Sequence, residues 1–101
     1  MSSTYVREKL WLAVHVLVTG DGGLQERLAS AGIGLIGLPK TVLLSTKNRE
    51  AFDSIIQGLT KEPALGNEGR LVATSRKMSD EEAKRIADEI LNLYRRLRGG
   101  M

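Results

Sequence analysis

The chain of 101 residues contains no cysteine, and this limits what it can fold into more than any other feature. Without a disulfide or a cysteine-based metal site, a domain of this size depends on a packed apolar core. Aromatic residues make up only 4% of the chain, so that core has to be built from Leu, Ile, Val and Ala. The length leaves room for a single domain, and we expect residues 1–101 to form it.

The segment 79–98 carries the clearest helical pattern. Ser79 is a typical N-cap residue, and Glu82, three residues later, completes a capping box. The first turn is acidic, as the helix dipole favours. The apolar stripe of this helix consists of Ala83, Ile86, Ala87, Ile90, Tyr94 and Leu97. Glycines end the helix, and we expect residues 95–101 to be a frayed C-terminal end.

Two helices are predicted in the first 40 residues. Residues 4–19 have apolar side chains on almost every side, which predicts a central helix that the others surround. Asp21 is the expected N-cap of the next helix, whose apolar stripe runs to Leu38. Three glycines within residues 31–38 weaken this pattern. Because each glycine destabilises a helix interior, the stretch is expected to fray, to kink or to pack very close to a neighbour.

A further helix is secure over residues 48–59, which carry an apolar face at helical spacing. Pro39, Thr46 or Asn48 is its expected start. Residues 70–77 fit either a short helix or a short strand.

The resulting prediction is an all-α fold, a compact bundle of four to five short helices. The alternative is a small α/β fold of order βαβαβα, because residues 13–19, 41–46 and 71–75 are each rich in β-branched side chains. Two features favour the all-α fold. The helical stripe of the first segment extends back to Val6, further than a strand needs, and the third segment lacks the continuous apolar run of a buried parallel strand.

Five short stretches of the sequence resemble a group of short helical bacterial proteins. Residues 8–17 (EKLWxAVHxL, where x marks positions outside the resemblance) and 24–28 (LQERL) are similar to the start of these proteins. Residues 68–70 (EGR) and 78–83 (MSDEEA), followed by Leu93-Tyr94, are similar to their end. The resemblance implies an all-α fold, and its motifs are not catalytic.

Catalytic and metal sites are not expected. His15 is the only histidine, and the nearest acids in the sequence are Glu8 and Asp21. Its apolar neighbours predict a hydrogen-bonded histidine at the edge of the core, with a pH-sensitive interface contact as the alternative. Zinc prefers cysteine or several histidines, and carboxylate sites need clustered acids. We therefore expect no enzyme activity, no metal and no cofactor.

The glycine-rich segment 20–23 is expected to be a plain turn between two helices. It lacks the lysine of a P-loop, and Gln25 occupies the third glycine position of a dinucleotide fingerprint. Under the α/β alternative, the same turn would place backbone N–H groups at a helix N-terminus, where they bind an anion or a nucleotide.

The net charge of the chain is only +3. The densest cationic group is Arg95, Arg96 and Arg98, which complements the C-terminal end of a helix dipole. These residues are also the candidate anion contacts of an alternative function, a nucleic-acid-binding accessory protein.

The compartment is predicted from cysteine and from the N-terminal pattern. The absence of cysteine fits a reducing compartment, and the apolar run from Leu10 to Val18 is too short to span a membrane. Residue Glu8 and the segment after the run are not typical of a signal peptide. We expect a cytoplasmic protein that does not bind a membrane.

The stretch 31–44 is apolar, with one charged residue, and it contains three glycines. Such a segment is either core or an exposed patch that contacts a partner. The expected function is that of a small protein-interaction or accessory domain that acts as a homodimer. The expected partner contacts are Ile33, Leu35, Ile36 and Leu38.

Overall fold

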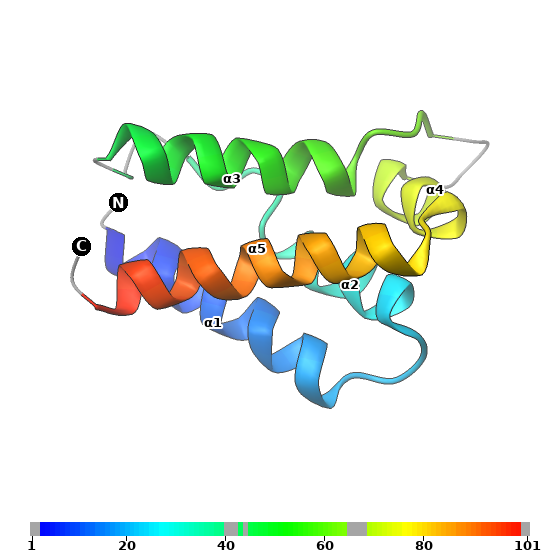
Figure 1. The fold of residues 1–101 in the computed structure, drawn as a ribbon, viewed down its shortest axis with the longest axis horizontal. Helices are drawn as coiled ribbons and strands as arrows, with labels where there is room; N and C mark the ends of the chain where they lie inside the picture. The colour runs from blue at the N-terminus through cyan, green and yellow to red at the C-terminus, as the bar shows by residue number, and fades with distance from the viewer. Residues whose placement is uncertain (1–2, 40–42, 44, 65–68, 100–101) are drawn as a thin grey trace.

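The computed structural model describes residues 3–39, 43, 45–64 and 69–99, and these residues form helices and loops without a strand. The helices are α1 (Ser3–Thr19), α2 (Leu24–Ile33), α3 (Thr46–Leu59), α4 (Arg70–Lys77) and α5 (Asp80–Arg98) (Figure 1). The all-α prediction is confirmed, and the βαβαβα alternative is wrong. Two of its strands, 13–19 and 71–75, lie in α1 and α4, and most of the third, 41–46, lies outside the described residues.

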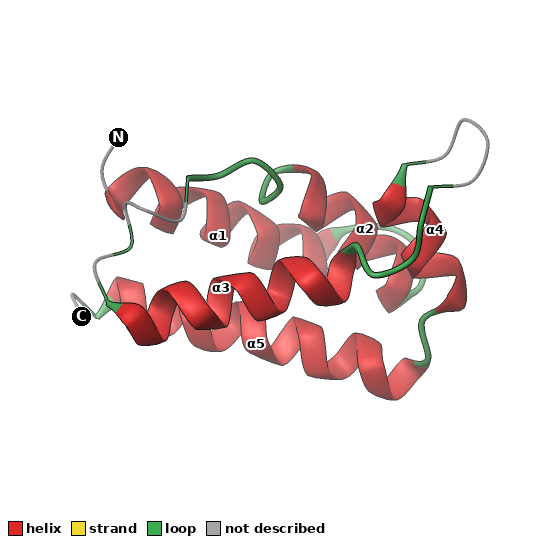
Figure 2. Cartoon of the chain, turned by 90° about the horizontal axis from the view of Figure 1, so that it is seen from above, coloured by secondary structure: helices red, strands yellow, loops and turns green. Residues whose placement is uncertain are grey.

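The helices pack along one another around a shared core. Both α1 and α3 run antiparallel to α5, and α3 and α5 lie side by side (Figures 1 and 2). Helix α1 packs against α2 and α5, whereas α4 packs against α2 and α3. The radius of gyration is 13.0 Å, about the 13 Å of a compact 100-residue domain. In the view of Figure 1, α5 passes between α3 and α1, so α1 lies at one side of the bundle.

The core is aliphatic, as the composition requires. Phe52 is the only phenylalanine of the chain, and it is buried among branched side chains. Each of the five helices contributes at least one buried residue. The side chains with almost no exposed surface include Val6, Leu10, Leu28, Leu35, Leu43, Ile55, Leu59, Ile86, Ile90 and Leu93.

Serine caps the two helices that pack against each other. Ser79 begins α5 as predicted, because its Oγ accepts a hydrogen bond of 3.1 Å from the backbone N of Glu82. The N-cap of α3 is Ser45, whose Oγ accepts from the backbone N of Asn48. The helix therefore begins at Thr46, one of the three expected starts, but neither Thr46 nor Asn48 is its cap. Serine at these positions satisfies an amide that has no partner within the helix.

The ends of α2 and α5 differ from the sequence prediction. Helix α2 stops at Ile33, and the turn that follows contains Gly37 at a φ of 87°. This backbone conformation favours glycine, so the apolar stripe does not continue as a helix to Leu38. Helix α5 remains helical as far as Arg98, in place of the frayed end expected from residue 95.

Gly32 allows α2 to approach α4 closely. A Cβ atom at this position would lie 2.6 Å from Leu71 Cδ2 and 3.3 Å from Leu59 Cδ1. Of the three outcomes expected for the glycine-rich stretch, close packing applies at Gly32. The end of the helix after Ile33 is not one of the three.

Candidate interaction surface

The outer face of α1 carries large apolar side chains that the bundle leaves exposed. Trp11 is 47% exposed, Leu12 49% and Val18 74%. The opposite face of the same helix holds Val6 and Leu10, which are buried. Helix α1 is thus apolar on both faces, and only one of them contributes to the core.

This placement corrects the prediction that α1 is a central helix. Its neighbours are α2 and α5, and these cover one side only. A helix that is apolar all round is normally buried on all sides. The sequence pattern assigns Leu12 and Val18 to the core, so sequence reasoning missed them as surface residues. The length of the chain could have indicated the exposed side of α1, because 101 residues form few other elements that could surround a helix of 17 residues.

An apolar groove of about 380 Å³ lies between α1 and α5. Val14, Leu17 and Val18 border it on the α1 side, and Leu91 borders it on the α5 side. The charged side chains Lys84 and Asp88 also line it; they are four residues apart on α5. Since Val18 and Leu91 are exposed, this groove continues the outer face of α1.

A smaller groove of about 110 Å³ lies along the other side of α1, against α2. It runs between Leu12 and Val16 of α1 on one side and Ser30 of α2 and Gly34, the residue after α2, on the other. The absence of a side chain at Gly34 leaves this groove open. The outer face of α1 is therefore a ridge with an apolar groove on either side.

His15 lies on the exposed face of α1 and not at the edge of the core. Its ring stacks on that of Trp11, with the two centroids 5.1 Å apart and the ring planes at 13°. The predicted hydrogen-bonded core histidine is wrong. The surface position leaves open the alternative, a contact at an interface.

The four predicted partner contacts do not share one environment. Ile33 is 72% exposed and Ile36 is also exposed, so both are available to a partner. Leu35 is completely buried in the core, and Leu38 is partly buried against it. Leu35 is therefore not a surface contact, because the turn after α2 directs it inward.

The three candidate anion contacts, Arg95, Arg96 and Arg98, also differ from one another in their surroundings. The Arg96 Nε donates a hydrogen bond of 3.0 Å to Oδ1 of Asn48, a buried residue of α3. Arg96 thus holds α5 to α3, whereas Arg95 and Arg98 are exposed at the same end of α5. The cations do not form one free cluster.

The turn at residues 20–23 joins two helices, as the sequence predicts. The N-cap of α2 is Gly23 and not Asp21. The carboxylate of Glu26 accepts the backbone N–H of Gly23 at 3.2 Å. Because an acid of the chain itself occupies the helix N-terminus, the geometry does not favour an anion site there.

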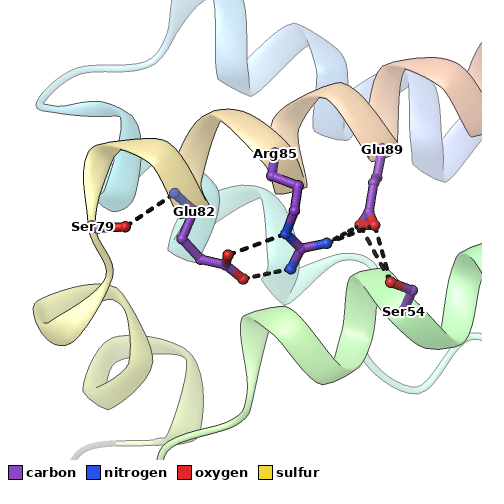
Figure 3. Close-up of polar contacts among 5 residues, drawn as sticks. All are labelled: Ser54, Ser79, Glu82, Arg85 and Glu89. Carbon is purple, nitrogen blue, oxygen red and sulfur yellow. Dashed lines mark hydrogen bonds and ion pairs between the residues drawn. The ribbon is translucent and has the colours of Figure 1, made fainter.

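A polar network joins the start of α5 to α3 (Figure 3). Arg85 donates to the carboxylate of Glu82 on one side, and its Nη1 lies 2.8 Å from Glu89 Oε1 on the other. Glu89 also accepts a hydrogen bond of 3.0 Å from Ser54 Oγ of α3. The hydrogen bond from Arg85 is the main cause that lowers the pKa of Glu82, and the same bond raises the pKa of Arg85. This network positions α5 against α3.

A metal-binding cluster and a membrane-spanning helix are both absent from the residues that the structure describes. No group of three or more His, Cys, Asp or Glu side chains there is arranged to hold a metal ion. None of the described helices combines the length and the apolarity needed to cross a membrane.

The fold and the exposed face of α1 define a five-helix bundle with an uncovered apolar ridge. Comparison with known proteins gives no match: no family model fits the sequence, and neither a curated protein nor a solved structure is similar to it.

Proposed function

We propose that this chain is a non-enzymatic protein-interaction domain and that the outer face of α1 is its contact surface. The observation that carries the proposal is the exposure of Trp11, Leu12 and Val18 on one helix. Contiguous apolar side chains with polar surroundings are typical of a surface that binds another protein. Ile33 and Ile36, two of the contacts predicted from the sequence, remain candidates for its border.

The energetics support this interpretation. Burial of apolar surface contributes about 25 cal/mol per Å², and aromatic anchors such as tryptophan are enriched among residues that dominate binding. A small domain has a narrow margin of stability and benefits when a partner covers such a surface. The proposal of a non-enzymatic role rests on the sequence, in which no arrangement of nucleophile, base and acid is recognisable.

Site-specific photo-crosslinking in cells tests the proposal. A photoreactive amino acid replaces Val18 in one variant and Gln57, an exposed residue of α3, in the control. We expect a discrete adduct with one protein from position 18 and none from position 57. The absence of an adduct at position 18, or the same pattern at both positions, would contradict the proposal.

Nucleic-acid binding is the second candidate function. Its support is the exposure of Arg95 and Arg98 at the end of α5. Binding to random duplex DNA at two salt concentrations tests it, because contacts to phosphates weaken steeply as salt rises. Affinity that does not change with salt, or that survives R95Q together with R98Q, excludes this candidate.

We further propose a cytoplasmic location. The absence of cysteine supports it, since a small domain in an oxidising compartment more often carries disulfides. Fractionation of cells that express the tagged full chain is the direct test.

A further inference from the structure

The exposed residues of α1 form a stripe along the whole helix. Its positions recur every three or four residues, which keeps them on one side of the helix. This α1 stripe consists of Thr4, Tyr5, Glu8, Trp11, Leu12, His15, Val18 and Thr19. The spacing is that of a helix that packs lengthwise against a second helix.

The α1 stripe is complementary to itself when it is reversed. Its midpoint lies between Trp11 and Leu12. Glu8 and His15 lie equally far from this midpoint on opposite sides, and so do Tyr5 and Val18. In an isologous contact, residue i of one copy meets residue j of the other, and residue j meets residue i.

We propose that two copies of the chain associate through the α1 stripe, with their α1 helices antiparallel about a two-fold axis beside Trp11 and Leu12. This inference rests on the proposed function, because both require the outer face of α1 to be a contact surface. Antiparallel packing about this axis places side chains from the same edge of the stripe against each other, so Trp11 meets Trp11 of the second copy on one edge and Leu12 meets Leu12 on the other. Both side chains are about half exposed in the single chain.

Charge complementarity selects a second copy as the occupant. Glu8 of each copy meets His15 of the other, and both side chains are exposed. An imidazole N–H donates to a carboxylate in the neutral and in the protonated form, so the pair forms in either state. A parallel arrangement would place Glu8 opposite Glu8, which is unfavourable. The two-fold antiparallel arrangement makes two favourable pairs for each dimer.

The two grooves extend the contact beyond the helix ridge. Val18 borders the groove between α1 and α5, on the same edge of the stripe as Trp11. Leu12 borders the groove between α1 and α2 and meets Leu12 of the second copy. Ridges that pack into grooves are the usual form of helix contacts.

The size of the contact predicts a weak dimer. A helix of 17 residues is about 25 Å long at 1.5 Å per residue. One pair of such helices buries less than the ~1,600 Å² of a standard interface. We therefore expect a dissociation constant between about 10 µM and about 1 mM.

Sedimentation equilibrium of the purified full chain tests the inference. At concentrations from about 5 µM to about 1 mM, which span the expected range, the wild-type chain should pass from monomer to dimer. The single variants E8H and H15E each replace the two charge pairs by like residues, and we expect dimerisation about fivefold to twentyfold weaker. The double variant E8H/H15E exchanges the partners and should restore the wild-type affinity. Glu50→His, at an exposed position of α3, is the matched control and should have no effect.

Three results would overturn the inference: a monomer at every concentration, dimerisation that E8H and H15E leave unchanged, or a double variant that does not recover. The substituted side chains lie outside the core, so helical circular dichroism should be the same in all variants. If the purified chain is monomeric and position 18 crosslinks to a different protein, the homodimer is excluded while the proposed interaction function stands.

Discussion

Trp11 and His15 stack on the outer face of α1, with their ring centroids 5.1 Å apart. The two residues are one helical turn apart, and neither contributes to the core. Trp11 is the only tryptophan of the chain, so its fluorescence reports on this face without interference.

We expect acrylamide to quench the fluorescence of Trp11 readily in dilute protein and less readily as the protein concentration rises. The reason is that the side chain is about half exposed in the single chain and covered when a second copy binds. The control is Val18→Glu, which places a charge in the apolar contact. Quenching that depends on concentration to the same degree in this variant would contradict an interface at the α1 stripe.

Substitution of a leucine by alanine should cost more stability on the buried face of α1 than on its exposed face. Leu10 is fully buried and Leu12 is half exposed. We expect Leu10→Ala to lower the free energy of unfolding by about 2–5 kcal/mol and Leu12→Ala by less than ~1 kcal/mol. Urea denaturation of dilute protein measures both values. Equal losses would show that the two faces are covered alike, contrary to the structure.

Gly32→Ala should destabilise the chain less when the side chain of Leu71 is shortened to alanine. In the wild-type chain, Gly32→Ala crowds Leu71 Cδ2, and this offsets the better helix propensity of alanine. In the background of Leu71→Ala we expect the same change to be more favourable by about 1 kcal/mol. Gly34→Ala is the control, because the nearest atom to its Cβ is 3.9 Å away. Additive effects of the two substitutions would argue against close packing of α2 on α4.

Removal of Arg85 should affect stability at neutral pH and not at acid pH. The pKa of Glu82 is lowered from its ordinary value of 4.5, mainly by the hydrogen bond from Arg85. The stabilisation is therefore present above the ordinary pKa and is lost as the pH falls through the lower value in the folded chain. We expect Arg85→Gln to cost up to ~1 kcal/mol at neutral pH, since the group is partly exposed, and almost nothing at a pH well below the lowered pKa of Glu82.

Urea denaturation at these two pH values measures the effect of Arg85. Lys84→Gln removes a neighbouring positive charge and should show little dependence on pH. If the cost of Arg85→Gln were the same at both pH values, the carboxylates would not be its partners.

Arg96→Leu should destabilise the chain more than Arg95→Leu. The first substitution leaves the buried Oδ1 of Asn48 without its hydrogen bond, and an unsatisfied buried polar group costs about 1–3 kcal/mol. Arg95 is exposed, and its loss should stay within about 0.5 kcal/mol. Thermal denaturation of both variants compares them directly, and similar losses would contradict the role of Arg96.

Local features of the sequence were sufficient to predict most of the helices. Ser79 and the apolar stripe that follows predict α5, because capping and side-chain spacing act within a few residues. The assignment of residues 70–77 could not be made in this way. Their helix is short, and its packing against α2 and α3 decides the conformation.

The sequence by itself determined that the core is aliphatic, and it favoured an all-α fold over the βαβαβα alternative. Only the tertiary structure decided which apolar residues enter that core. Leu10 and Leu12 are identical side chains on α1, yet Leu10 is buried and Leu12 is half exposed. After α2, Leu35 is buried, whereas Ile36 next to it is exposed. Burial depends on whether another element lies opposite the side chain, and α1 has such neighbours on one side only. That missing neighbour turns a pattern typical of a central helix into a candidate contact surface.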